Sequence, residues 1–161
     1  MLVVHVTDKK TAEIIKKEGY QCRDYSGKHP IGAKCTTFFY PLNGVDRDLE
    51  FVPQNARLMG KDVDEYATYV ICEVEDCKVG DLHLETSPER YRANTMSLNE
   101  YQENDFNRGR FEEPEVVCTQ PVPATKVLGV LPHSKMKEIF DSCPLTDKTD
   151  CMKKKIMSAI K

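Results

Sequence analysis

The chain has 161 residues, of which 40% are hydrophobic and 30% are charged. These proportions are typical of one folded domain with a core of its own, and they exclude a disordered chain. The formal net charge of −3 excludes a strong overall attraction to nucleic acids or anionic membranes, so a nucleic-acid partner would require a local basic patch.

The first predicted elements are a strand and a helix. Residues 3–7 form a β-branched run that contains His5, which favours a strand. A helical pattern follows immediately, with Thr7 or Asp8 as its N-cap. Gly19 ends this pattern, because glycine readily adopts the left-handed conformation of a helix C-terminus.

Two further strands are predicted at residues 35–40, which are rich in threonine and aromatic residues, and at residues 66–74. Between them, residues 40–65 are rich in Pro, Gly, Asn and Asp. This composition predicts a long loop with little regular structure, as active-site loops often have. Residues 86–112 are also polar and mix helix-like turns with loop signals.

A Glu-x-Glu pair stands directly before the next apolar run. Glu113 and Glu115 are separated by Pro114, and the apolar residues 116–118 that follow predict a strand. A further strand is predicted at residues 126–131, after a turn marked by prolines. Because side chains alternate along an extended segment, the two carboxylates are expected to point the same way.

The C-terminal part is predicted to be helical. Ser134 is suited to cap a helix that runs through Phe140. Residues 147–161 place five side chains on one helical face: Cys151, Met152, Ile156, Met157 and Ile160. We therefore expect one domain at residues 1–132 and a helical extension at residues 133–161 that packs on it.

The order of these elements resembles the ADP-ribosyltransferase superfamily. The resemblance covers residues 3–131 and rests on the strand with His5, the helix that ends at Gly19, the Thr-Thr-aromatic strand and the Glu-x-Glu pair before a strand. It implies an α+β fold with a split antiparallel sheet as the core and flanking helices. It also implies that NAD is the substrate and that ADP-ribose is moved to a macromolecular acceptor, either protein or nucleic acid.

The resemblance assigns residues of the first two strands to NAD. The triplet at residues 5–7 matches the one that holds the adenosine half, and an aromatic ring from Phe38 or Tyr40 would stack on nicotinamide. The second strand departs from the superfamily pattern, because Cys35 stands in place of the first serine. Residues 51–59 are similar to a loop of DarT-type toxins, which modify DNA bases. The residues implied in NAD binding are His5, Val6, Thr7, Thr36, Thr37, Phe38, Tyr40 and Arg57.

Glu115 and Glu113 are the candidate catalytic residues. Breaking the bond between nicotinamide and ribose leaves an oxocarbenium-like sugar, which a carboxylate beside it, here Glu115, would stabilise. Glu113 would accept a proton from the acceptor or pair with a cationic target such as arginine. The same residues also fit simpler interpretations, in which the glutamates form a solvated acidic turn and His5 is a satisfied core histidine.

Two other functions are compatible with the sequence. A non-catalytic module of the same fold would bind ADP-ribose, nucleic acid or a protein partner, and the departure at Cys35 favours it. An NAD-dependent RNA 2′-phosphotransferase would need several basic residues around a phosphate, for which the chain offers Arg23, Arg57, Arg108 and Arg110. Arg108 and Arg110 also lie shortly before the Glu-x-Glu pair. They would either contact phosphates of the target or belong to a solvated loop.

The seven cysteines are odd in number and scattered along the chain. This favours reduced thiols, and together with the lack of a recognisable secretory signal it predicts a cytoplasmic protein. No metal is expected, because no Cys/His spacing typical of zinc is present. No apolar run has the length of a membrane span, so no membrane partner is expected.

Overall fold

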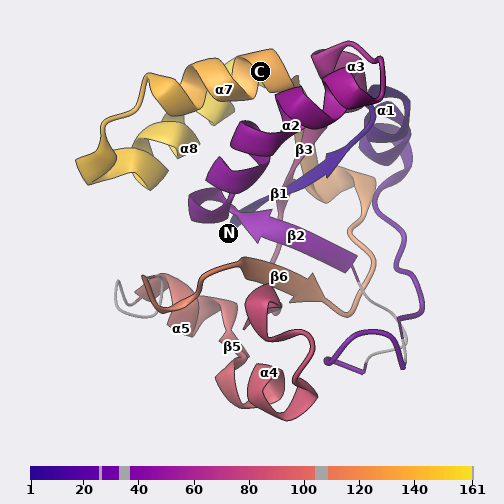
Figure 1. The fold of residues 1–161 in the computed structure, drawn as a ribbon, viewed down its shortest axis with the longest axis vertical. Coiled ribbons are helices and arrows are strands. Elements are labelled where there is room, and N and C mark those ends of the chain that lie inside the picture. Colours follow the sequence, from indigo (N-terminus) through magenta and orange to yellow (C-terminus); the bar gives the residue numbers. More distant parts are fainter. Residues whose placement is uncertain (26, 33–36, 104–108, 161) are drawn as a thin grey trace.

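The computed structural model describes residues 1–25, 27–32, 37–103 and 109–160. Its centre is one open antiparallel sheet with the strand order β5-β4-β6-β2-β1-β3-β7 (Figure 1). The strands are β1 (Leu2–Thr7), β2 (Thr37–Pro41), β3 (Thr68–Glu73), β4 (Lys78–Asp81), β5 (Met96–Ser97), β6 (Pro114–Cys118) and β7 (Val127–Pro132). The α-helices of the described residues are α1 (Lys9–Glu18), α2 (Asp46–Leu58), α3 (Val63–Tyr66), α4 (Pro88–Asn94), α5 (Leu98–Glu103), α7 (His133–Asp141) and α8 (Lys148–Ala159). The prediction of a mixed fold around an antiparallel sheet is confirmed.

The pairing between β1 and β2 is short. Strand β1 pairs with β3 along six residues, whereas β1 and β2 share only the pairs Val3↔Pro41 and Val4↔Tyr40. Strand β2 continues away from β1 and pairs instead with β6, from Thr37↔Cys118 to Phe39↔Val116. We call the region where β1 and β2 separate, beyond Val4 and Tyr40, the seam.

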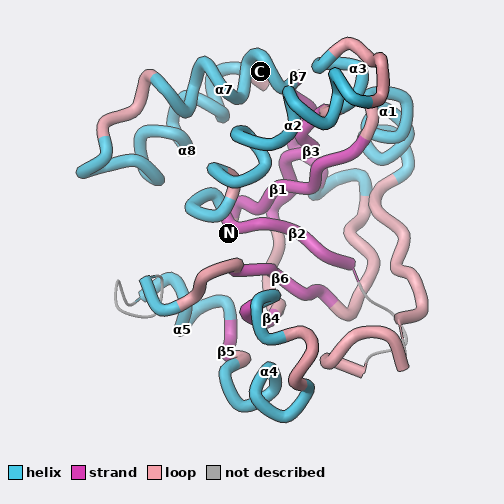
Figure 2. Tube along the Cα trace, in the orientation of Figure 1, coloured by secondary structure: helices cyan, strands magenta, loops and turns pink. Residues whose placement is uncertain are grey.

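The first side of the seam is built by burial of apolar side chains on both faces of β1, β3 and β7. On one face, Met136 of α7 and Ile156 of α8 are fully buried with Tyr69 and Ile71 of β3. Figure 2 shows α2, α7 and α8 together beside these strands. The opposite face is covered by α1, whose Ala12 packs in a second cluster that includes Val3 and Val70. Each large apolar side chain buried in this way contributes roughly 1.5–3 kcal/mol relative to exposure.

Helix α1 matches its prediction. The Asp8 side chain caps it by accepting a hydrogen bond of 3.0 Å from the backbone N–H of Thr11. Gly19 follows the last helical residue with φ +82°, which side chains other than glycine rarely tolerate. A Cβ at this position would also lie 2.5 Å from the carbonyl oxygen of Val122. Glycine is therefore required here both by the backbone conformation and by the close approach of a neighbouring segment.

The prediction of a long loop over residues 40–65 is wrong, because this stretch contains α2 and α3. The segment at residues 51–59, interpreted as a DarT-like loop, lies almost wholly in α2. Leu49, Val52 and Ala56 recur at helical spacing and are buried, so they hold the helix against the sheet. Pro53 removes one backbone donor from the helix interior, yet burial of this apolar face outweighs that loss.

The boundaries of two other elements also differ from expectation. Strand β3 begins at Thr68, because Tyr66 belongs to α3 rather than to the strand predicted from it. Helix α7 begins at His133, one residue before the predicted cap. Ser134 instead donates hydrogen bonds of 2.7 Å from its backbone N–H and its hydroxyl to the two carboxylate oxygens of Asp64. These bonds fix the start of α7 to α3.

The prediction of reduced cysteines is not supported. The sulfur atoms of Cys77 and Cys118 lie within bonding distance, and so do those of Cys143 and Cys151. Cys77 and Cys118 stand at adjacent ends of β4 and β6, a proximity that depends on strand pairing and that sequence spacing does not reveal. Cys72 is buried and free. Among the described residues, no helix is both long and apolar enough to cross a membrane.

Candidate functional site

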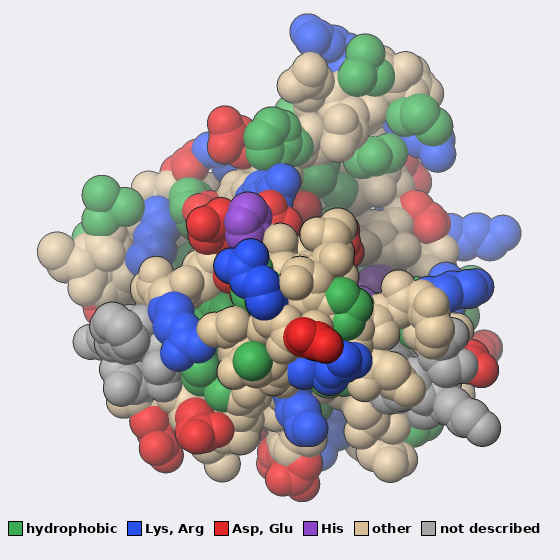
Figure 3. All heavy atoms as spheres, turned by 60° about the horizontal axis from the view of Figure 1, so that its bottom comes forward, with side chains coloured by type: hydrophobic (Ala, Val, Ile, Leu, Met, Phe, Trp, Pro, Cys, Tyr) green, Lys and Arg blue, Asp and Glu red, His purple; other side chains and the backbone are tan. Residues whose placement is uncertain are grey.

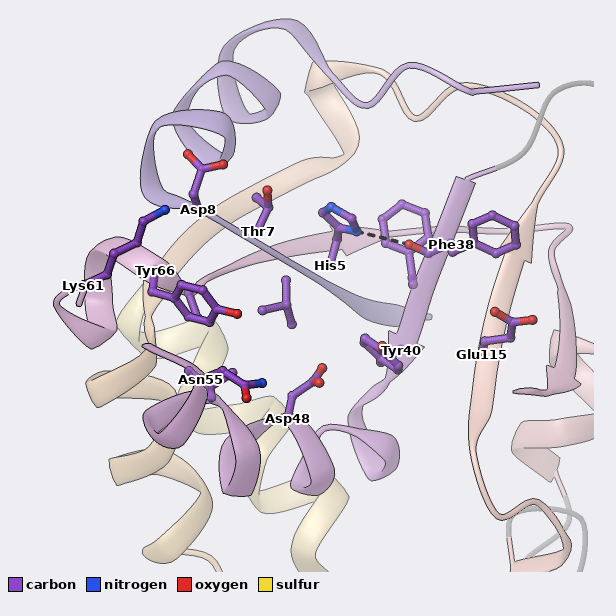
Figure 4. Close-up of a pocket in the computed structure, with 14 residues that line it drawn as sticks. His5, Thr7, Asp8, Phe38, Tyr40, Asp48, Asn55, Lys61, Tyr66 and Glu115 are labelled. Atoms are coloured by element: carbon purple, nitrogen blue, oxygen red, sulfur yellow. Dashed lines mark hydrogen bonds between the residues drawn. The ribbon is translucent and has the colours of Figure 1, made fainter. Parts of the chain in front are cut away.

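A cavity of about 500 Å³ opens along the seam. Strand β1 contributes His5, Val6 and Thr7, strand β2 contributes Phe38, Phe39 and Tyr40, and β6 contributes Glu115. Helix α2 closes the cavity with Asp48, Val52 and Asn55. Figure 4 shows Tyr40 and Glu115 toward one end and Asp8, Lys61 and Tyr66 at the other.

Several of the predicted site residues meet in this cavity, and others do not. Arg57 lies on α2 but is exposed and does not line the cavity. Thr36 and Arg108 lie outside the described residues, and Thr37 is the first residue of β2. Glu113 lies in an adjoining hollow described below. The predicted residues that line the cavity are His5, Val6, Thr7, Phe38, Tyr40 and Glu115.

His5 makes two hydrogen bonds, one of which crosses the seam to β2. Its Nδ1 lies 3.2 Å from the carbonyl oxygen of Phe38, and its Nε2 lies 3.3 Å from the hydroxyl of Tyr20. Because a carbonyl oxygen only accepts, Nδ1 carries the proton and Nε2 accepts from Tyr20. Burial lowers the pKa of His5, so the ring is neutral at neutral pH. In this arrangement the imidazole has no donor left for a ligand.

Glu115 is the buried carboxylate of the cavity, with 4% of its surface exposed. Its Oε1 lies 2.7 Å from Nε2 of His29 and accepts a hydrogen bond of 2.7 Å from the hydroxyl of Tyr91. Burial raises the pKa of Tyr91, and the charge of Glu115 adds to this, so the hydroxyl stays protonated and donates. Oε2 accepts no hydrogen bond from the described part of the chain.

Gly80 makes the contact between Tyr91 and Glu115 possible. Gly80 of β4 is the cross-strand partner of Glu115 on β6. A Cβ at position 80 would lie 2.1 Å from the hydroxyl oxygen of Tyr91, well inside van der Waals contact. The phenol ring therefore lies in the space that a side chain would fill. Glycine is required here for close approach rather than for an unusual backbone conformation.

The turn that precedes Glu115 is held by Asp81, a buried carboxylate at the end of β4. Asp81 accepts hydrogen bonds from the backbone N–H groups of Glu112 at 3.1 Å and Glu113 at 2.9 Å. It also accepts one of 3.2 Å from the backbone N–H of His83. These bonds determine where Glu113 leaves the turn and where Glu115 enters β6.

Glu113 faces a second hollow of about 450 Å³ beside the cavity. Its carboxylate forms an ion pair with Arg47 of α2. Tyr40 and Asp48 line both the cavity and this hollow, so the two spaces adjoin. Glu115 thus lines the cavity and Glu113 lines the adjoining hollow, and Tyr40 borders both.

Asp48 is the clearest unpartnered acceptor of the site. Its Oδ2 is buried and makes no hydrogen bond within the described residues. Burial raises the pKa of Asp48, while neighbouring Arg47 opposes the shift. Burial also raises the pKa of Tyr40 to about 12, with a further contribution from the charge of Asp48, so its hydroxyl remains a donor. A buried acceptor without a partner is costly unless a ligand or water satisfies it.

The far end of the cavity carries one cation, Lys61, and one carboxylate, Asp8. Among the described residues, Lys61 is the one lysine or arginine whose side chain lines the cavity. Arg110 is bonded to Asn94 on α4 rather than to the cavity. On the face of the molecule that carries α4 and α5, Lys and Arg side chains are interspersed with Asp and Glu side chains (Figure 3). Among the residues described on that face, the positive charges do not form the single basic patch expected for a nucleic-acid partner.

Sequence reasoning missed His29, Tyr91 and Asp48. His29 lies in a short turn between two glycines with positive φ, Gly27 and Gly32, and no motif marks it. Tyr91 lies in a polar stretch, and its approach to Glu115 depends on strand pairing. Asp48 had a detectable signal, because it lies one helical turn before Val52 and two before Asn55, both on the cavity side of α2.

Over the described ranges, no group of three or more His, Cys, Asp or Glu side chains is arranged to hold a metal ion. Comparisons of the chain with protein-family models, with curated proteins and with solved structures found no match.

Proposed function

We propose that this protein transfers ADP-ribose from NAD to a macromolecular acceptor, with Glu115 beside the reacting ribose. The observation that carries the proposal is the composition of the seam cavity. Residues from three strands that the sequence assigned to NAD chemistry, His5 and Thr7, Phe38 and Tyr40, and Glu115, line one space. They are separated by up to 110 positions in the chain.

The size of the cavity and two of its polar side chains support the proposal. Its volume of about 500 Å³ lies within the range of roughly 300–1,000 Å³ found for small-molecule sites. Asp48 offers an unsatisfied acceptor for a sugar hydroxyl, and Lys61 offers a cation for the diphosphate at the far end. Because both ring nitrogens of His5 are engaged, Thr7 and Asp48 are better placed than His5 to bind sugar hydroxyls.

The proposed reaction breaks one bond and forms one. The bond between ribose C1′ and the nicotinamide nitrogen breaks with its electron pair going to nicotinamide, and the acceptor's nucleophilic atom bonds to C1′. Glu115 stabilises the positive charge that develops on the sugar, at a position where few waters compete. Glu113, in the adjoining hollow, receives the proton that the acceptor loses.

The test is incubation of the protein with NAD labelled in its ADP-ribose part, separately with cell-extract protein, single-stranded DNA and RNA. Glu115→Gln preserves size and polarity but removes the charge, and we expect it to reduce transfer by at least about 100-fold. Glu138→Gln is the matched control, because Glu138 is exposed on α7 and pairs with Lys135. Full transfer by Glu115→Gln would contradict the assignment.

A non-catalytic module that binds ADP-ribose is the second candidate, favoured by the engagement of both nitrogens of His5. It predicts that calorimetry detects ADP-ribose binding while the folded protein releases no nicotinamide from NAD. The RNA 2′-phosphotransferase alternative has less support. It needs several cations around a phosphate, and in the described part of the chain only Lys61 reaches the cavity.

A further inference from the structure

A turn distant in sequence from the Glu-x-Glu pair reaches the carboxylate of Glu115. Residues 27–32 belong to the segment between α1 and β2 and lie beside α4 in Figure 1. The turn is anchored by a hydrogen bond of 3.1 Å from Arg92 of α4 to the carbonyl oxygen of Pro30. A bond of 3.0 Å from the backbone N–H of Gly32 to the carbonyl oxygen of His29 closes it internally, and one of 3.1 Å from the backbone N–H of His29 to the carbonyl oxygen of Tyr25 ties it to the preceding segment. These anchors deliver the side chain of His29 to β6.

The hydrogen bonds of His29 specify which ring nitrogen carries the proton. The backbone N–H of Ile31 donates to Nδ1 at 3.1 Å. Nδ1 must therefore carry a lone pair, and the proton of the neutral ring lies on Nε2. Nε2 in turn lies 2.7 Å from Oε1 of Glu115, so it donates to the carboxylate. The contact is a charge-assisted hydrogen bond from a neutral imidazole rather than an ion pair.

Ring packing prevents the imidazole from turning away. The ring of His29 lies 4.7 Å from that of Phe38 and 5.1 Å, edge-on, from that of Tyr91. Its side chain is 9% exposed. His29 and Tyr91 thus approach the same oxygen of Glu115 as donors, while Oε2 has no partner among the described residues. Two donors on one oxygen fix the rotation of the carboxylate and leave the other oxygen for a ligand.

We propose that His29 is a positioning residue, which orients Glu115 as a neutral imidazole protonated on Nε2. This inference rests on the proposed function for its catalytic consequence, but the arrangement itself does not. His29 acts through Glu115 and does not line the cavity. Its role therefore predicts an effect on turnover of NAD rather than on the affinity for NAD.

The arrangement is tested without any activity, by long-range proton–nitrogen NMR correlation on protein with ¹⁵N-labelled histidines. The chain has four histidines, and His29→Gln identifies the signal of His29. At neutral pH we expect His29 to be protonated on Nε2, and His5, which donates from Nδ1 to Phe38, to show the opposite tautomer. A proton on Nδ1 of His29, or on both nitrogens, would overturn the proposal.

The consequence for turnover is tested with two variants. His29→Leu removes the donor, and we expect kcat to fall about 10- to 100-fold while KM for NAD stays nearly constant. His29→Gln replaces the ring by an amide donor and is expected to restore part of that loss. Equal kcat in His29→Leu and the unmodified protein, with equal unfolding midpoints, would overturn the positioning role. If the unmodified protein itself turns over no NAD, the proposed function fails, and the tautomer measurement alone decides the assignment of His29.

Discussion

The two sides of the seam are stabilised in different ways. On the first side, β1 pairs with β3 along six residues, and the helices bury apolar side chains on both faces, such as Tyr69 on one and Val70 on the other. On the second side, β6 pairs with β2 and β4 over shorter registers, and its centre holds the buried carboxylates of Glu115 and Asp81. The second side also carries the Cys77–Cys118 disulfide.

The contrast shows how a buried charge shapes the structure around it. An apolar side chain is stabilised by any close-packed neighbour, whereas a buried carboxylate is tolerated only where donors meet it. The second side also buries apolar side chains, such as Val79 and Val116, but its two carboxylates depend on individual partners. His29 and Tyr91 meet Glu115, and the backbone of the 112–113 turn meets Asp81. The candidate site lies where this polar region meets the apolar one.

The largest effect on stability is expected from a cavity on the apolar side. Met136 of α7 is completely buried in the cluster that contains Tyr69 and Ile71 of β3, so Met136→Ala should lower the free energy of unfolding by about 2–5 kcal/mol. Leu58→Ala is the control, because Leu58 is 73% exposed, and its effect should be near zero. Urea denaturation measures both. Equal destabilisation by the two variants would show that α7 does not support the sheet as described.

Removal of the Cys77–Cys118 disulfide should destabilise the second side of the seam more than the first. The bond spans 41 residues, so the double variant Cys77→Ala, Cys118→Ala should lose about 2–4 kcal/mol of stability. The Cys143–Cys151 pair spans 8 residues, and its removal should cost less, because a shorter loop restricts the unfolded chain less. Amide hydrogen exchange should quicken in β4 and β6 more than in β1 and β3. Uniform quickening across the sheet would contradict the division at the seam.

The buried His5 at the seam should make the stability of the protein depend on pH. Burial lowers the pKa of His5 in the folded state below the unfolded value of about 6.5. Below that pH the unfolded chain binds more protons, so stability is complete above about pH 6.5 and is lost as the pH falls toward the folded pKa. His5→Gln should show a shallower loss over this interval in urea denaturation. Identical pH dependence in both proteins would mean that His5 is not buried as a neutral ring.

The smallest effect is expected from the ion pair between Arg47 and Glu113. Arg47 is mostly exposed, and exposed ion pairs contribute little after solvent screening and loss of side-chain freedom. Arg47→Gln should leave the unfolding midpoint unchanged within error. A clear loss of stability would show that this pair is more than a surface contact and that the hollow beside Glu113 is structurally coupled to the fold.

The apolar side was largely predictable from sequence, because the spacing of apolar residues along a helix or strand indicates which of its faces is buried. Asp8 and Gly19 bound α1 as expected, and the buried Met152 and Ile156 of α8 lie on the predicted face. Helix α2 was missed because Pro53 and several turn-forming residues masked the spacing of Leu49, Val52 and Ala56. Residues 46–58 form a helix because burial against the sheet stabilises it, and local composition alone does not predict such burial.

The polar side was predictable only in part. Glu115 was predicted as a site residue from its place before a strand, but its partners come from a loop 86 residues earlier and a helix 24 residues earlier. Such contacts are created by strand order and leave no periodic signal. The same limit explains the cysteines, since Cys77 and Cys118 become neighbours only when β4 pairs with β6.

Gly80 offers a way to perturb the candidate site without deleting a single polar atom. Alanine at this position adds one methyl group to β4, where the hydroxyl of Tyr91 now lies. The tyrosine would be displaced from Glu115 while every donor, acceptor and charge remained in the protein. Such a variant would test whether the properties of the candidate site depend only on which polar groups are present, or also on the close approach of the Tyr91 ring to β4 and β6.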